Sequence, residues 1–145
     1  MYAVQQSRCA YCGISILPGS GAHIEHFAYK DKYPEWIFEL KNLVLSCPHC
    51  NASCKRTYDT IISPVQAVYQ ENHYSIVHPL FDDFYDFIEW VPGTYPRPKG
   101  GLTANDLRKA QETIEIFNLS EDYRVNMHCV INSSPELQCI AEYLP

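Results

Sequence analysis

The stretch from Cys9 to Lys55 decides the fold. It opens with Cys9-Ala-Tyr-Cys12 and closes with Cys47-Pro-His-Cys50-Asn51. Each Cys-x-x-Cys pair lets two sulfurs of a tight turn reach one ion, and zinc takes four such ligands tetrahedrally. The two pairs therefore predict a structural zinc site. The 34 residues between Cys12 and Cys47 exceed the loop of a short zinc ribbon, so we expect a further functional segment between the pairs.

Length and composition indicate one globular domain. The chain has 145 residues, of which 46% are apolar and 13% aromatic. Its apolar runs are too short to span a bilayer and no signal peptide opens it, so we expect a cytoplasmic protein without membrane contact. The seven cysteines are an odd number, which disfavours a closed set of disulfides and favours a metal site in a reducing compartment.

The charge distribution is unusual for a protein that binds nucleic acid. The net charge is −6. Residues 1–60 carry six Lys/Arg and five Asp/Glu, whereas residues 61–145 carry five and twelve, so the acidity lies in the second half. Long-range attraction of a polyanion is therefore weak. Any affinity for nucleic acid must come from local contacts or from a partner protein.

The pattern of turn residues and apolar periodicity predicts an α+β fold. The clearest helix begins at the capping box Thr103-Ala-Asn-Asp106 and runs to about Asn118, with apolar residues at helical spacing. An aromatic patch within residues 31–40 is expected in the core. Further short strands are predicted within 14–22, 23–28, 74–77 and 87–91. Further helices are predicted from Asn51, from Ser63 to about Glu71, and from Ser134.

The segment between the cysteine pairs carries side chains suited to hydrolysis. A carboxylate such as Glu25 is a hard ligand for Mg²⁺ or Mn²⁺, and a neutral imidazole such as His26 can deprotonate a water. Adjacent residues on a strand point to opposite sides, whereas a bent hairpin arm lets both line one cleft. Asn51 can add a second oxygen ligand, and Lys55, four residues on, can meet a phosphate from the same helical face.

These motifs together resemble the HNH endonucleases with the ββα-metal fold. The resemblance covers about the first 55 residues. It rests on both cysteine pairs, on Ile24-Glu25-His26-Phe27, on Asn42-Leu-Val-Leu-Ser-Cys47 and on Cys50-Asn51 with Lys55. It implies that His26 is the general base and that Glu25 and Asn51 bind the catalytic Mg²⁺ or Mn²⁺. It also implies that Asn42 holds the hairpin loop and orients the base, while Cys9, Cys12, Cys47 and Cys50 hold the structural zinc. The family more often has Asp or His at the position of Glu25.

The resemblance divides the chain into a nuclease core at residues 1–60 and a mostly helical extension at 61–145, packed together as one domain. The extension is similar to those of bacterial anti-phage defence nucleases, such as the nuclease subunit of Septu-type systems. Within it, Arg97 and Lys99 are either nucleic-acid contacts or part of a solvated loop. The implied function is metal-dependent cleavage of DNA alongside a partner protein. The alternative is a zinc-stabilised adapter that binds nucleic acid or protein without catalysis.

Overall fold

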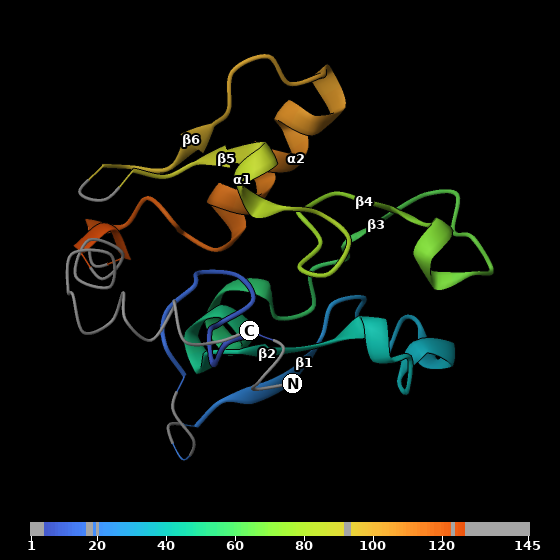
Figure 1. The fold of residues 1–145 in the computed structure, drawn as a ribbon. Helices are drawn as coiled ribbons and strands as arrows, with labels where there is room; N and C mark the ends of the chain where they lie inside the picture. Colours follow the sequence, from blue (N-terminus) through green and yellow to red (C-terminus); the bar gives the residue numbers. More distant parts are fainter. Residues whose placement is uncertain (1–4, 17–18, 20, 92–93, 123, 127–145) are drawn as a thin grey trace.

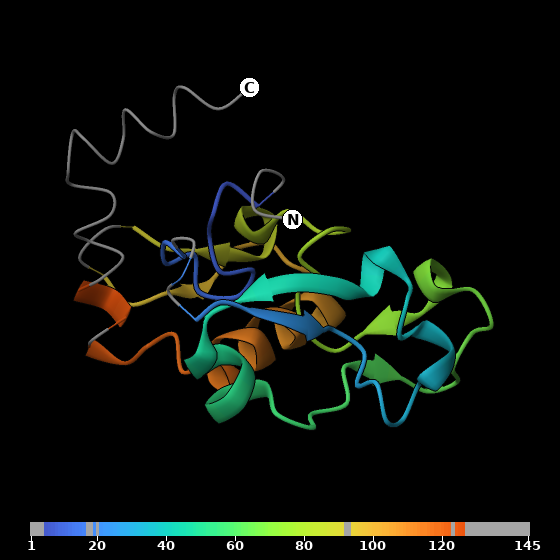
Figure 2. The ribbon, with the colours of Figure 1, turned by 90° about the horizontal axis from the view of Figure 1, so that it is seen from below.

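The computed structural model describes residues 5–16, 19, 21–91, 94–122 and 124–126. Two strands and a helix form the unit that carries the predicted site (Figures 1 and 2). Strand β1 (His23–His26) pairs antiparallel with β2 (Leu43–Ser46), and the π-helix η3 (His49–Lys55) follows β2 directly. Strand, strand and helix thus occur in the order expected for a ββα-metal core.

Helical elements and two further strand pairings make up most of the rest of the described chain. Residues 34–42 form the 3-10 turns η1 (Pro34–Trp36) and η2 (Leu40–Asn42) between β1 and β2. The second half contains β3 (Ile61–Ile62) paired with β4 (His73–Tyr74), the 3-10 turn η4 (Tyr69–Glu71), α1 (Phe84–Phe87), β5 (Ile88–Glu89) paired with β6 (Arg97–Pro98), and α2 (Ala104–Ile116).

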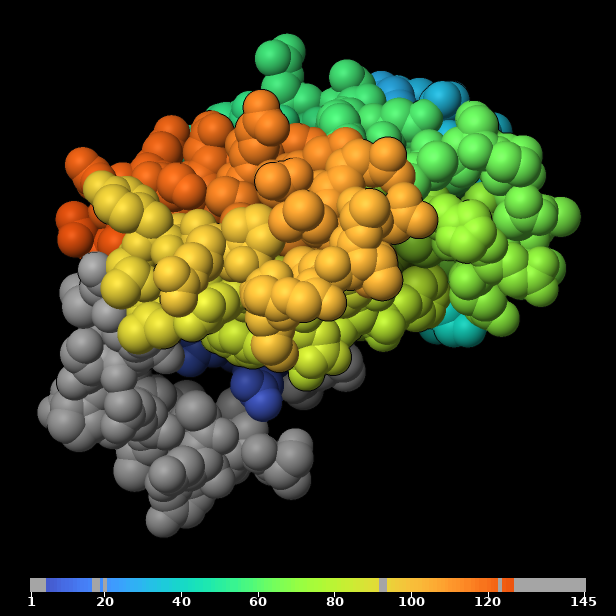
Figure 3. Space-filling view, turned by 90° about the horizontal axis from the view of Figure 1, so that it is seen from above, coloured from blue at the N-terminus to red at the C-terminus, as the bar shows by residue number. Residues whose placement is uncertain are grey.

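Helix α2 confirms the predicted amphipathic helix. Its N-cap is Thr103, whose hydroxyl accepts a hydrogen bond from the N–H of Asp106. Figure 3 shows α2 and the β5–β6 ribbon side by side on one face of the molecule. The described part of residues 61–126 nevertheless consists of short strands as well as helices, so a mostly helical extension is not confirmed. The helix predicted from Ser134 lies outside the described residues.

Two other predicted elements are wrong. Residues 14–22 contribute only an isolated bridge between Arg8 and Ser15 in their described part. The helix predicted from Ser63 is limited to η4, because the Asn72 side chain takes over the backbone bonds of this segment. Its amide accepts from the N–H of Gln66 and donates to the carbonyls of Gln66, Val68 and Tyr69.

The aromatic patch of residues 31–40 divides between core and surface. Tyr33 and Trp36 are buried and stack on each other, as predicted. Phe38 is 89% exposed and Leu40 77% exposed, so their assignment to the core is wrong. Leu40 is the first residue of η2, and Phe38 lies in the short link between η1 and η2, where both side chains face solvent.

One hydrophobic cluster contains residues from both halves of the chain. Tyr11, inside the first cysteine pair, stacks on Phe117 near the end of α2, with ring centroids 4.1 Å apart. Phe27, directly after β1, packs at 4.3 Å on the ring of His78 in the second half. The residues that follow β1 are therefore fixed by side chains distant in sequence.

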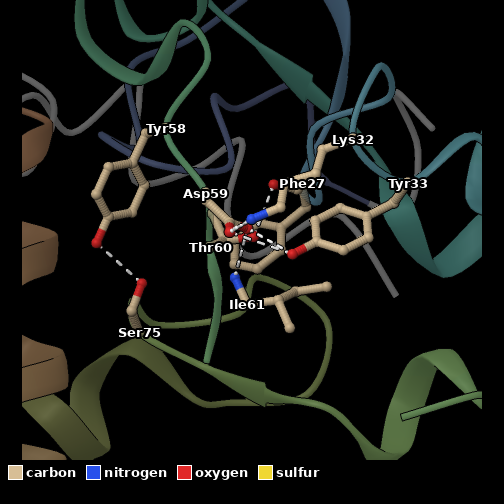
Figure 4. Close-up of polar contacts among 8 residues, drawn as sticks. All are labelled: Phe27, Lys32, Tyr33, Tyr58, Asp59, Thr60, Ile61 and Ser75. Atoms are coloured by element: carbon tan, nitrogen blue, oxygen red, sulfur yellow. Dashed lines mark hydrogen bonds and ion pairs between the residues drawn. The ribbon is translucent and has the colours of Figure 1, made fainter. Parts of the chain in front are cut away.

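The linker at residues 58–61 adds polar contacts between the halves (Figure 4). Asp59 accepts hydrogen bonds from the Tyr33 hydroxyl and the Ile61 N–H, and it pairs with Lys32. The buried Thr60 hydroxyl donates to the carbonyl of Phe27 at 2.9 Å. On the other side, the Tyr58 hydroxyl lies 3.0 Å from that of Ser75. Among the described helices, none combines the length and the apolar character needed to cross a bilayer.

Candidate functional site

The β1–β2 hairpin fixes the directions of Glu25 and His26. Glu25 lies opposite Val44 and His26 opposite Leu43 in a regular antiparallel register. Successive side chains of a strand alternate between its faces. Accordingly Glu25 is buried, while its neighbour Ile24 is 62% exposed and His26 is half-buried. The strand runs without a bend through both residues, so the carboxylate and the imidazole leave it on opposite sides.

The buried face of β1 packs against η3, where Lys55 meets Glu25. The ammonium Nζ of Lys55 lies 2.6 Å from Oε1 of Glu25 and donates to the carbonyl of His26 at 2.9 Å. Burial lowers the pKa of Lys55, and the negative charge of Glu25 opposes that effect. With its side chain only 1% exposed, Lys55 is inaccessible to a phosphate, which corrects its assignment as a nucleic-acid contact.

Asn51 lies on the same helix and contacts His23. Helix η3 begins after Pro48 and not at Asn51, and the N–H of Asn51 already donates to the carbonyl of Cys47. This corrects the start of the helix that was predicted from Asn51. The Asn51 amide nitrogen lies 3.0 Å from Nδ1 of His23. Since an amide NH₂ only donates, His23 accepts, and the Asn51 oxygen remains as a ligand atom.

Glu25 and Asn51 therefore lie at one interface between β1 and η3. The second carboxylate oxygen of Glu25, Oε2, has no polar partner among the described residues. The carboxylate oxygen of Glu25 and the amide oxygen of Asn51 are hard oxygen ligands of the kind that Mg²⁺ and Mn²⁺ bind. His23 also belongs to this interface. The signal for it in the sequence is its position two residues before Glu25, on the same face of a strand.

His26 is held on the other side of β1 by a backbone carbonyl. Its Nε2 lies 3.1 Å from the carbonyl oxygen of Ile37. A carbonyl only accepts hydrogen bonds, so Nε2 carries the hydrogen and donates it. In the neutral ring Nδ1 then holds the lone pair. The contact with Ile37 thus selects the tautomer in which Nδ1 can take a proton.

Asn42 fastens the loop that contains Ile37. Its side chain is fully buried, and its amide nitrogen donates to the carbonyls of Trp36 at 3.0 Å and Ala28 at 3.3 Å. Its oxygen accepts from the N–H of Ala28 at 2.6 Å and from the Tyr69 hydroxyl at 3.1 Å. Asn42 does not touch the His26 ring. It positions the turn at Trp36, and the residue after Trp36, Ile37, binds that ring.

The four cysteines of the two pairs form a buried cluster whose sulfurs all lie within 4.8 Å of one another. The sulfurs of Cys12 and Cys47 are 3.9 Å apart, too far for a disulfide. Four ligands at about 2.3 Å from a central ion in a tetrahedron lie about 3.8 Å from each other. Gly13, with φ +68°, turns the chain after the first pair, and its N–H donates to the carbonyl of Cys9.

The burial of this cluster also fits a bound cation. Hydrogen bonds with the neighbouring thiols lower the pKa of Cys47 and raise the pKa of Cys50. Four thiolates cannot be buried together unless a cation neutralises them. The cluster Cys9, Cys12, Cys47 and Cys50 can therefore hold a metal ion such as zinc.

Arg97 and Lys99 lie away from this site. The β5–β6 ribbon that contains Arg97 is on the opposite side of the molecule from the β1–β2 hairpin (Figure 1). Arg97 is paired with Glu89 at 3.0 Å, and Lys99 donates to the carbonyl of Tyr85 at 3.0 Å. Both are exposed at the surface. The structure does not bring them together with Glu25 and His26.

Comparison with known proteins agrees with this geometry. The family model of the HNH endonucleases matches residues 9–56. Over 63 residues the chain is 33% identical to the Septu protein PtuB of Bacillus thuringiensis, a stretch that covers 43% of this chain. The chain spans about a quarter of the length of that relative, 24%. Residues 9–56, with their strand–strand–helix order and four-cysteine cluster, match the HNH endonuclease family model, and we refer to them as the HNH domain.

Proposed function

We propose that the protein is a metal-dependent endonuclease that hydrolyses phosphodiester bonds of DNA. The observation that carries the proposal is the fixed tautomer of His26, across strand β1 from an oxygen-ligand pair. Its Nε2 is bound to the carbonyl of Ile37, and its Nδ1 is left as the base. Nδ1 of His26 would accept the proton of a water as that water attacks the phosphorus and the P–O3′ bond breaks, releasing the 3′ oxygen, which takes up a proton from solvent.

Glu25 Oε2 and the Asn51 amide oxygen would hold the divalent ion. When bound, Mg²⁺ or Mn²⁺ supplies electrostatic stabilisation of the charge that develops on the phosphate. Lys55 and His23 orient the two ligand side chains, through the Glu25 ion pair and the Asn51 hydrogen bond. Cys9, Cys12, Cys47 and Cys50 would bind zinc and hold η3 against the hairpin, since the second pair leads directly into η3.

The biological setting we propose is anti-phage defence in the cytoplasm, together with a partner protein. The support is the similarity to a Septu protein, which covers part of each chain. The net charge of −6 adds to it, because an acidic chain has little electrostatic attraction for DNA. A partner that binds DNA would supply the affinity that this chain lacks.

A nicking assay tests the proposal. Supercoiled plasmid DNA and a structured RNA of similar length are incubated with the protein in Mg²⁺, in Mn²⁺ and in EDTA. We expect conversion of the plasmid to open circles only with a divalent ion, and slower cleavage of the RNA. Cleavage in EDTA would contradict the role of Glu25 and Asn51.

The adapter without catalysis remains the second candidate. The acidic charge favours it, because a protein adapter does not need to attract DNA. An adapter has no chemical need for the Nε2–Ile37 contact that prepares His26 as a base. Plasmid that stays intact with either ion, while the protein still forms a stable complex with DNA or protein, would favour the adapter.

A further inference from the structure

We propose that Tyr69 and His78, outside the HNH domain, are positioning residues for the nuclease site because they hold Asn42 in one orientation. The inference rests on the proposed function and extends it beyond residues 9–56. Tyr69 lies in η4, and His78 follows β4. Both side chains are buried.

The hydrogen bonds of Asn42 have only one consistent direction. The Ala28 N–H can only donate, so the atom 2.6 Å from it is the amide oxygen of Asn42. The carbonyls of Trp36 and Ala28 can only accept, so the NH₂ group faces them. The Tyr69 hydroxyl, 3.1 Å from the Asn42 oxygen, must therefore donate to it.

His78 supplies the hydrogen bond that leaves the Tyr69 proton free for Asn42. The N–H of Leu80 donates to Nδ1 of His78 at 3.1 Å, so Nδ1 carries the lone pair. Burial, together with the nearby Lys109, lowers the pKa of His78 to about 3, so the ring is neutral. Nε2 then carries the hydrogen and donates to the Tyr69 oxygen, 3.0 Å away. Tyr69 accepts from His78 and donates to Asn42.

His78, at the end of this chain of hydrogen bonds farthest from Asn42, is also held in place. The His78 N–H donates to Asp82 at 2.7 Å, and Asp82 pairs at 2.5 Å with Lys109 of α2. The His78 ring stacks on Phe81, with centroids 4.1 Å apart. The second half thus presents a preoriented donor to Asn42.

Tyr69 and His78 are expected to affect catalysis through the backbone at Trp36 and Ile37. Asn42 binds the carbonyl of Trp36, and the next residue, Ile37, binds His26. If the Tyr69 hydroxyl is removed, the Asn42 side-chain oxygen loses one of the two hydrogen bonds that it accepts, and the amide group can rotate. The turn at Trp36 then loosens, and the His26 ring loses its fixed direction. The effect is expected on the rate of the chemical step and not on DNA binding.

The test uses the full-length protein and compares Tyr69→Phe with Tyr58→Phe. Both substitutions remove one hydroxyl from the region where the halves meet. The Tyr58 hydroxyl binds Ser75 and Glu112 and has no contact with Asn42. Two quantities are measured. These are the hydrogen-exchange rate of the Asn42 side-chain amide by NMR, and kcat and KM for nicking of supercoiled plasmid with Mn²⁺.

We expect Tyr69→Phe to raise the Asn42 exchange rate and to lower kcat, each on the order of tenfold, with KM unchanged. Tyr58→Phe should change neither by more than about twofold. His78→Gln, which retains an N–H donor in place of Nε2, should stay close to the parent, and His78→Leu should behave like Tyr69→Phe.

An Asn42 exchange rate that is the same in Tyr69→Phe and the parent would overturn the inference. Equal losses of kcat in Tyr58→Phe and Tyr69→Phe would also overturn it, because they would indicate general loosening. If the parent protein does not cut DNA, the proposed function fails, but the exchange rate of Asn42 still decides whether Tyr69 and His78 hold it.

Discussion

Lys55 and Glu25 form an ion pair of 2.6 Å inside the protein, with only 1% and 8% of their side chains exposed. Lys55 also binds the carbonyl of His26, so one ammonium group fixes a proposed metal ligand and the backbone of the proposed base. The pair joins the end of η3 to β1, the two elements that the ββα unit must hold together. A side chain expected to contact DNA is therefore part of the interior of the site.

Loss of one member of this pair should destabilise the fold strongly. Lys55→Met leaves the Glu25 charge buried without a partner, which typically costs about 3–5 kcal/mol. Urea unfolding followed by circular dichroism measures the change. Lys32→Met is the matched control, because the Lys32–Asp59 pair is 55% exposed at the lysine and solvent screens its charges, so its loss should lower stability much less. Equal losses of unfolding free energy in Lys55→Met and Lys32→Met would contradict the burial of the Lys55–Glu25 pair.

A double substitution separates the charge from the packing. Glu25→Gln with Lys55→Met removes both charges, so it should be less destabilising than the sum of the single changes. The same unfolding experiment supplies the double-mutant cycle. Additive effects would indicate that the two side chains do not interact in the folded protein.

Acid should destabilise the protein through His78. Its pKa is lowered to about 3 in the folded state, chiefly by burial, whereas an unfolded histidine titrates near 6.5. Between these values the unfolded chain binds one more proton, so the free energy of unfolding falls as pH falls, by about 1.4 kcal/mol per pH unit well below 6.5. His78→Gln should lack this slope. Urea unfolding between pH 7 and 5, with parent and variant compared at each pH, measures it. Parallel curves would contradict a neutral, buried His78.

Metal removal should unfold the HNH domain. The four thiolates are buried, and bound metal supplies folding free energy to a small unit of this kind. We expect one zinc per chain by elemental analysis, and loss of zinc with a lower melting temperature in Cys47→Ala. Cys54→Ala is the control, because the sulfur of Cys54 lies outside the four-cysteine cluster. Folded protein without zinc, or a Cys47→Ala variant that melts like the parent, would contradict the structural role.

The sequence predicted the parts of the site that depend on local spacing. Short-range rules predict the cysteine pairs, the strand of Glu25 and His26, and the capped helix at Thr103. The role of Asn42 was implied by the resemblance to the HNH family. The sequence did not predict the contacts made from the second half. Tyr69 and His78 reach Asn42 through tertiary packing, and no periodicity within their own segment indicates it.

The orientation of Lys55 was also not predicted from the sequence. An α-helix starting at Asn51 would place Lys55 one turn on, beside Asn51 and toward solvent. The helix instead starts after Pro48 and has π geometry, with the Arg56 N–H bonded to the carbonyl of Asn51. That change of phase turns Lys55 toward Glu25. π-Helices are rare and short, so residue propensities do not predict one at this position.

The most direct test of the account is the single-turnover nicking rate of His26→Ala beside the parent, with the same divalent ion and saturating plasmid. His26 touches the loop carbonyl of Ile37 and none of the zinc cysteines, so zinc content and melting temperature should stay close to those of the parent. Loss of a general base typically lowers the rate by about 10²–10⁴-fold. We predict a fall in that range. A His26→Ala protein that nicks DNA as fast as the parent would contradict the assignment of His26 as the base.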